Sequence, residues 1–182
     1  MKVVELEPGG FAEETPRSEP PSRPDETTDG QPDAASPSRE RPLVLVVDDE
    51  ASIRLLCAVN LRLEGMDTVE AGSGDEALEA ARKLRPDLVL LDVMMPRVDG
   101  WQVAHELARD PATCDVPIVF MSARAEPADY LRGYELGAVA YVTKPFDPTA
   151  LGATLHHVLR LSRAEREALC RERMDELGSA RS

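Results

Sequence analysis

Cysteine and histidine, the residues that build disulfide frameworks and zinc sites, are scarce in this sequence. The 182 residues include three cysteines and three histidines. Cys57, Cys114 and Cys170 are odd in number, widely spaced and outside any C-x-x-C pattern. This spacing argues against a disulfide framework and against a zinc site. We therefore expect the cysteines to be thiols in a reducing cytoplasm.

Long hydrophobic runs and an excess of positive charge are also missing. No apolar stretch approaches the length of a membrane span, and the N-terminus turns acidic at Glu5 before a signal-peptide core could form. The formal net charge of -13 repels nucleic-acid backbones, and no cluster of lysine and arginine offsets it. We expect a cytoplasmic protein with no membrane insertion and no direct contact with nucleic acid.

Residues 1–42 differ in composition from the rest of the chain. They contain eight of the fifteen prolines, one aromatic residue, and many acidic and hydroxyl side chains. Such a segment cannot bury enough apolar surface to offset its chain entropy. We predict a disordered acidic, proline-rich tail, followed by one folded domain over residues 43–161.

Apolar strands and amphipathic helices alternate five times within that domain. The first strand, Leu43–Val47, is a continuous apolar run, which is typical of a parallel sheet buried on both faces. Ser73 and Asp99 are suited to cap the second and third helices. The alternation predicts an α/β protein with a doubly wound, five-stranded parallel sheet between two layers of helices.

Polar side chains gather where the predicted strands end. Asp48 and Asp49 follow the first strand, Asp92 and Ser122 end the third and fourth, and Lys144 follows the fifth. In such sheets ligands bind beyond the carboxyl ends of the strands. Converging carboxylates repel one another unless a cation lies among them, and oxygen ligands suit Mg²⁺ or Mn²⁺. A phosphoryl group could then be held by the metal, the Lys144 ammonium and the Ser122 hydroxyl.

These residues resemble the characteristic set of the bacterial response-regulator receiver domains, which are CheY-like proteins of two-component signalling. The segment Asp92 to Gly100 matches the family's D-x-x-M-P-x-x-D-G pattern. The resemblance extends from about Leu43 to Leu161, and its other elements are Asp48-Asp49, Ser122 and Lys144-Pro145. Each element alone is a weak indication, whereas the combination is specific. It implies a flavodoxin-like sheet of strand order 2-1-3-4-5.

The resemblance also implies a role for each site residue. Asp92 would attack a phosphohistidine and become an aspartyl phosphate. Asp49, Asp92 and the backbone carbonyl of Met94 would ligate Mg²⁺, with Asp48 acting through a metal-bound water. Lys144 would neutralise the developing charge. The chain would catalyse only its own phosphorylation and dephosphorylation and would not be an enzyme acting on other substrates.

A conformational switch is the expected output of such a site. The resemblance implies that Ser122 moves to hydrogen-bond the phosphoryl group and that Tyr141 swings inward, although an aromatic residue in a terminal strand also suits plain packing. A cis peptide bond is implied before Pro145. The face expected to change and to bind a downstream protein, which the sequence does not identify, comprises the fourth helix, fifth strand and last helix, at residues 128–136, 139–142 and 151–161.

Two regions and two alternative functions stay open at this point. Residues 162–182 predict a charged extension of the last helix with a narrow stripe of Cys170, Met174 and Leu177. This extension could be a solvated tail, or it could be a partner-docking or dimerising helix. No output domain is recognisable after residue 161, so we expect a stand-alone regulator supplied by a sensor histidine kinase or a phosphotransfer protein. The alternatives are a pseudo-receiver that binds partners without phosphorylation and, with less support, an aspartyl-nucleophile phosphatase.

Overall fold

The computed structural model describes residues 39–123 and 126–179. The tail predicted over residues 1–42 therefore lies almost wholly outside the described residues. Its last four residues are described, and they contact the folded domain. Arg39 donates to the backbone carbonyl of Arg85 at 2.9 Å, and Arg41 donates to that of Arg62 at 2.8 Å. The folded unit accordingly begins at Arg39, four residues before the predicted boundary at Leu43.

Five parallel strands form one sheet in the order β2-β1-β3-β4-β5, as the resemblance implied. Neighbouring strands pair without a break in register except for an irregularity between β4 and β5 at Ile118 and Val119. The three central strands are almost completely buried, which explains their continuous apolar sequences. The strands are Leu43–Val47 (β1), Asp67–Ala71 (β2), Leu88–Asp92 (β3), Ile118–Ser122 (β4) and Ala138–Thr143 (β5).

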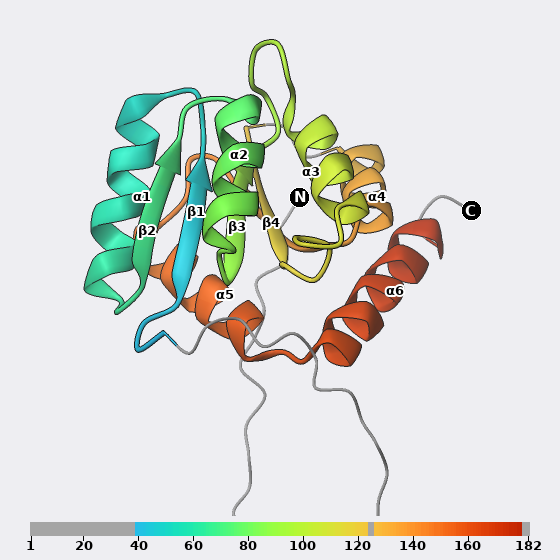
Figure 1. Ribbon diagram of the computed structural model, residues 1–182. Helices are drawn as coiled ribbons and strands as arrows, with labels where there is room; N and C mark the ends of the chain where they lie inside the picture. Colours follow the sequence, from blue (N-terminus) through green and yellow to red (C-terminus); the bar gives the residue numbers. More distant parts are fainter. Residues whose placement is uncertain (1–38, 124–125, 180–182) are drawn as a thin grey trace, which may run out of the picture. The chain divides into compact units, whose positions relative to one another are not determined.

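Helices cover both faces of the sheet (Figure 1). One core cluster joins the sheet to α1 and α5, and a second joins it to α2 and α3 on the other face. This is the predicted three-layer architecture. The helices are Ala51–Leu63 (α1), Gly74–Leu84 (α2), Gly100–Arg109 (α3), Pro127–Glu135 (α4), Pro148–Arg160 (α5) and Arg163–Ser179 (α6).

The predicted helix caps at Ser73 and Asp99 are confirmed. The Ser73 hydroxyl accepts a hydrogen bond from the Glu76 amide, and the Asp99 carboxylate accepts one from Gln102 at 2.8 Å. The Gln102 side chain accepts a hydrogen bond from the Asp99 amide in return, which completes a capping box. Both caps start helices at the end of the sheet where the polar residues gather.

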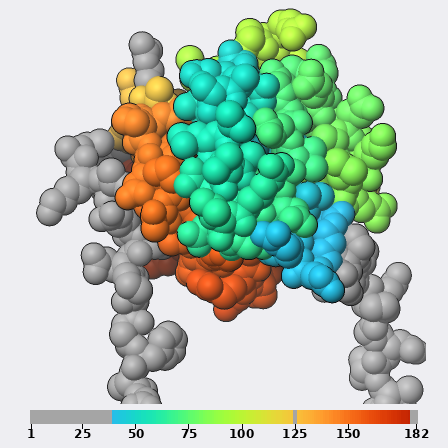
Figure 2. All heavy atoms as spheres, turned by 90° about the vertical axis from the view of Figure 1, so that its left-hand side faces the viewer, coloured from blue at the N-terminus to red at the C-terminus, as the bar shows by residue number. Residues whose placement is uncertain are grey.

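Helix α1 turns large apolar side chains outward. The sequence marks this helix by Leu55, Leu56, Val59 and Leu63, yet these side chains are exposed, Leu63 to 81%. The face packed on the sheet instead contains Cys57, Ala58 and Leu61. Figure 2 shows α1 across the face of the molecule turned toward the viewer. The apolar residues thus predicted the helix correctly but do not identify its buried face.

The C-terminal segment is a separate helix, which corrects the prediction that it extends the preceding one. Helix α5 ends at Arg160, because Leu161 adopts an extended conformation with φ -74° and ψ 131°. Ser162 then caps α6: its amide and hydroxyl donate to Glu165 at 2.7 Å. Helix α6 folds back and packs against α4 and β5. The sequence pattern Ser162-x-x-Glu165, a capping box, could have revealed this new start.

Candidate functional site

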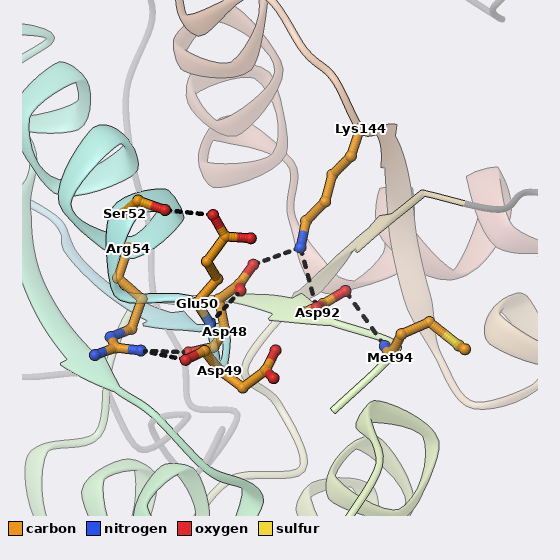
Figure 3. Close-up of polar contacts among 8 residues, drawn as sticks. All are labelled: Asp48, Asp49, Glu50, Ser52, Arg54, Asp92, Met94 and Lys144. Carbon is orange, nitrogen blue, oxygen red and sulfur yellow. Dashed lines mark hydrogen bonds and ion pairs between the residues drawn. The ribbon is translucent and has the colours of Figure 1, made fainter. Parts of the chain in front are cut away.

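Three strands bring acidic and basic side chains to the carboxyl end of the sheet. Asp48 and Asp49 follow β1, Asp92 is the last residue of β3, and Lys144 follows β5 (Figure 3). The predicted cluster is therefore assembled, with Lys144 pointing at Asp48 and Asp92. The Lys144 Nζ lies 2.5 Å from Asp48 Oδ2 and 3.0 Å from Asp92 Oδ2.

The three carboxylates are close enough to share one ion. One oxygen from each of Asp48, Asp49 and Asp92 lies within 4.8 Å of the others. Asp48 and Asp92 are buried, with 0% and 4% of their surface exposed, whereas Asp49 is exposed. The cluster therefore opens to solvent on the Asp49 side, where a small ligand could enter.

Backbone hydrogen bonds orient the two buried carboxylates. The Glu50 amide donates to Asp48 Oδ1 at 2.9 Å, and the Met94 amide donates to Asp92 Oδ1 at 3.3 Å. Arg54 of α1 donates to the backbone carbonyl of Asp48 at 2.7 Å, which holds the start of the loop after β1. Each carboxylate thus has one oxygen on a backbone amide and the other on Lys144.

Burial and neighbouring charges shift the pKa values of this cluster in opposite directions. Burial raises the pKa of Asp48, and the hydrogen bonds from Lys144 and Glu50 oppose that shift. For Lys144, burial favours the neutral amine, but hydrogen bonds and charges from Asp48 and Asp92 outweigh it, so its pKa is raised. Lys144 therefore stays protonated and supplies one positive charge among three carboxylates.

A hard divalent cation fits the remaining negative charge. With all three carboxylates ionised, one ammonium leaves an excess of two negative charges, all carried on oxygen. Oxygen donors of this kind suit Mg²⁺ and Mn²⁺. Carboxylates this close are costly to keep ionised without such compensation. The donor set and its spacing thus agree with the predicted metal site.

Ser122 and Pro145 also lie at this end of the sheet. Ser122 ends β4, beside β3, and only 3% of its surface is exposed. Its backbone carbonyl accepts a hydrogen bond from the Lys144 amide at 2.8 Å, which ties β4 to the loop after β5. The Lys144–Pro145 peptide bond is cis, as predicted.

Tyr141 lies on β5, and its side chain contacts α4. Its hydroxyl donates to the backbone carbonyl of Asp129 at 2.7 Å. Its ring packs near the rings of Phe120, Tyr130 and Tyr134, with centroids 4.7 to 5.6 Å apart. The structure thus shows the packing contacts of Tyr141, and its role in a switch stays a prediction.

Gly100 is a site residue whose role the sequence analysis did not state. A Cβ on Gly100 would lie 2.2 Å from the backbone oxygen of Asp92 and 2.8 Å from the Cα of Val93. The Gly100 amide also donates to the Val93 carbonyl at 3.0 Å. Only glycine lets α3 begin this close to the strand end that carries Asp92. The Asp99-Gly100 pair in the D-x-x-M-P-x-x-D-G segment was the available signal.

The sheet and its acidic end define a class of doubly wound α/β proteins that bind ligands at the strand ends. Comparison with known families makes this specific. Residues 44–156 match the family model of the response regulator receiver domain. The chain therefore belongs to the response-regulator receiver family.

Individual relatives agree with this assignment. The chain is 47% identical over 117 residues to "Probable transcriptional regulator ycf27" of Pyropia yezoensis, covering 64% of this chain and 47% of the relative. It is 43% identical over 117 residues to the phosphate regulon transcriptional regulatory protein PhoB of Pseudomonas aeruginosa, covering 64% and 51%. The chain thus spans about half the length of the curated relatives it matches.

A solved structure shows the same fold. The chemotaxis protein CheY4 of Vibrio cholerae superposes with a TM-score of 0.63 at 32% identity, covering 65% of this chain and 98% of that one. Within the described part of the chain, none of the helices combines the length and apolar character needed to span a bilayer.

Proposed function

We propose that this chain is a response regulator of the cytoplasm, which accepts a phosphoryl group on Asp92. The observation that carries the proposal is the placement of Asp92: its carboxylate ends β3, with Lys144 at 3.0 Å and two further carboxylates within metal-sharing distance. The donor would be a sensor histidine kinase or a phosphotransfer protein. Membership of the receiver family supports this direction of transfer.

The metal would be held by this chain's oxygen atoms. Asp49, Asp92 and the backbone carbonyl of Met94 would ligate Mg²⁺ or Mn²⁺, and Asp48 would act through a bound water. When bound, the ion would stabilise the negative charge that spreads over the phosphoryl oxygens during transfer. Solvent access at Asp49 and exposure of the Met94 side chain support an entry route there.

The transfer exchanges one bond for another. A carboxylate oxygen of Asp92 would form a bond to phosphorus while the phosphorus–nitrogen bond of the donor's phosphohistidine breaks, leaving the imidazole with the electron pair. Lys144, kept protonated by Asp48 and Asp92, would hold one phosphoryl oxygen, and the Ser122 hydroxyl would hold another. The same groups would assist hydrolysis by water, so the chain would act only on its own phosphate.

Exposed apolar side chains beside the site are suited to a protein donor. Helix α1 starts at Ala51, two residues after Asp49, and Leu55 and Leu56 lie within about two helical turns of its start. Contiguous apolar side chains on a surface are typical of protein interaction sites. We propose that the donor protein contacts this surface while its phosphohistidine reaches Asp92.

Output through protein contact fits this chain better than direct binding of nucleic acid. The net charge of -13 opposes contact with a phosphate backbone. We propose that a downstream protein binds the surface of α4, β5 and α5, and that Ser122 and Tyr141 link this surface to the phosphate.

Intact mass after incubation with acetyl phosphate and Mg²⁺ tests the proposal. We expect one phosphoryl adduct on the wild-type chain and on Asp99→Asn, a control that changes another carboxylate of the same loop and can still cap α3. Asp92→Asn and a sample treated with a chelator should show none. Absence of an adduct on the folded wild type, with Mg²⁺ and with Mn²⁺, would leave a phosphorylation-independent binding module. Continuous turnover of an added phosphomonoester would instead indicate a phosphatase.

A further inference from the structure

Helix α6 covers one edge of the molecule. It packs against α4 and β5, and β5 is an edge strand of the sheet (Figure 1). Its inward face follows a helical spacing of three and four residues and consists of Arg166, Leu169, Cys170, Arg173, Met174 and Leu177. We call the surface beneath it, formed by α4 and the outer edge of β5, the α4–β5 face.

Helix α6 is held mainly by a half-buried stripe, in which Leu169 packs against the core cluster on the α1 and α5 side of the sheet. Cys170 is its one buried residue within the described chain, and the Cys170 thiol donates to the Ala138 carbonyl of β5 at 3.0 Å. Arg163 pairs with Asp115, but both side chains are more than 60% exposed. Exposed ion pairs contribute little to stability. Helix α6 therefore has fewer fully buried side chains than α1 or α5.

The connection to α5 allows α6 to move as one piece. The extended Leu161 separates the two helices, and the Ser162–Glu165 capping box satisfies the first amides of α6 without help from α5. Release of α6 would thus not require α5 to unwind. It would expose the β5 edge, whose unpaired backbone groups can bind another chain.

Packed side chains connect the α4–β5 face with the strand beside Asp92. Phe120 lies on β4, next to β3, and its ring contacts that of Tyr141, with centroids 5.3 Å apart. Tyr141 in turn holds the Asp129 carbonyl of α4 and contacts the ring of Tyr134. Tyr134 lies on α4, the helix against which α6 packs. A shift of β4 or of Tyr141 would therefore alter the surface on which α6 rests.

We propose that α6 is a displaceable cover of the α4–β5 face, which is part of the surface assigned above to the downstream protein under the proposed function, and that this protein replaces α6 with a helix of its own. The partner helix would present an apolar stripe with arginines at its border, because this is the pattern that the face now holds in α6. Asp115 at one end of the face pairs with Arg163 and would pair with a partner's arginine in the same way. The further statement that a phosphoryl group on Asp92 promotes release of α6 rests on the proposed function.

Two buried cysteines make the release measurable in the full chain. Cys170 lies on the inward face of α6, against β5, whereas Cys57 lies in the core with 0% exposure, and Cys114 is exposed. Alkylation by iodoacetamide, followed for each cysteine by peptide mass spectrometry, reports local opening at Cys170 and global unfolding at Cys57. If α6 is a cover, Cys170 reacts about tenfold or more faster than Cys57. Equal rates for the two would overturn the proposal.

A matched pair of variants checks that the opening belongs to α6. Met174→Ser removes an apolar side chain from the inward stripe, and Ala168→Ser makes a comparable change on the exposed face of the same helix. We expect Met174→Ser to accelerate alkylation of Cys170 about fivefold, while Ala168→Ser leaves it unchanged and Cys57 stays protected in both. Equal effects of the two substitutions would show that the inward stripe does not hold α6.

The same measurement with acetyl phosphate and Mg²⁺ tests the link to Asp92. Intact mass first establishes whether the adduct is present. We expect Cys170 in the phosphorylated chain to react about fivefold faster, and a labelled peptide of residues 162–179 to bind that form and Met174→Ser better than the unmodified chain. An adduct without faster alkylation of Cys170 would overturn the statement that phosphorylation promotes release of α6, and the statement that α6 is a displaceable cover would stand. A missing adduct would overturn the proposed function, while the Cys170 and Cys57 rates would still decide whether α6 opens.

Discussion

Helices α1 and α6 show opposite relations between composition and packing. Helix α1 is rich in leucine, yet four of its large apolar side chains are exposed. Helix α6 is dominated by charged residues, yet it covers the edge strand β5 with a narrow inward face. Apolar content alone would predict that α1 is buried on all sides and that α6 is exposed to solvent. A helix pattern therefore predicts that a helix forms, whereas neighbouring elements decide which side is covered.

The largest difference in the free energy of unfolding should be found between substitutions on the two faces of α1. Leu61 is completely buried and Leu63 is 81% exposed, so the same substitution tests both faces. We expect Leu61→Ala to lower the free energy of unfolding by about 2 to 5 kcal/mol. Leu63→Ala should change it by no more than about 0.5 kcal/mol. Urea denaturation measures both, and similar losses would mean that the outer face of α1 is also packed in solution.

Two glycines allow the packing of α4 against β5 to be compared with the open surroundings at the C-terminal end of α6. A Cβ on Gly133 would lie 1.7 Å from the Tyr141 hydroxyl, whereas a Cβ on Gly178 would meet nothing within 4 Å. We expect Gly133→Ala to cost about 1 to 3 kcal/mol through displacement of Tyr141. Gly178→Ala should stabilise α6 by up to about 1 kcal/mol. Thermal unfolding of both variants checks the signs, and an unchanged midpoint for Gly133→Ala would contradict the packing of Tyr141.

The half-buried stripe of α6 should contribute less than the core face of α1. Leu177 faces inward near the end of α6 but keeps part of its surface exposed. We expect Leu177→Ala to cost about 1 kcal/mol or less, because little apolar area leaves water there. Urea denaturation of Leu177→Ala and Leu61→Ala compares the losses in the free energy of unfolding directly. A loss as large as that of Leu61→Ala would identify α6 as part of the main core.

The smallest effect should come from the ion pair that joins α6 to the loop before β4. Arg163 and Asp115 are both largely exposed, so solvent screens their attraction. We expect Arg163→Ala to leave the unfolding midpoint unchanged within the precision of the measurement, at low and at high salt. A clear loss at low salt that disappears at high salt would show that this pair anchors α6.

Much of the fold followed from patterns along the chain. The apolar runs of β1, β3 and β4 and the caps at Ser73 and Asp99 occupy their predicted places, because buried strands and helix starts restrict residue type strongly. The acidic residues and Lys144 meet because parallel strands end at one edge of the sheet. The receiver resemblance, read from the same residues, agrees with the family match.

The remaining features depend on contacts between distant segments. The lateral position of α1 on the sheet determines that Leu61 is buried and Leu63 exposed. Lys144 lies 96 residues from Asp48 along the chain. The hydrogen bond and negative charge of Asp48 raise the pKa of Lys144, and residues near Lys144 in the sequence do not predict this contact. Gly100 and Gly133 are needed because another segment's backbone or side chain approaches them.

The sequence by itself determined the order of strands and helices, the helix caps and the set of polar residues at the strand ends. These features depend on periodicity, on backbone hydrogen bonding near each residue and on the geometry of parallel sheets. The tertiary structure alone decided that Lys144 bridges Asp48 and Asp92 and that α6 turns back over β5. Such contacts depend on which surfaces meet after folding, and surface complementarity between distant segments leaves no local pattern in a sequence.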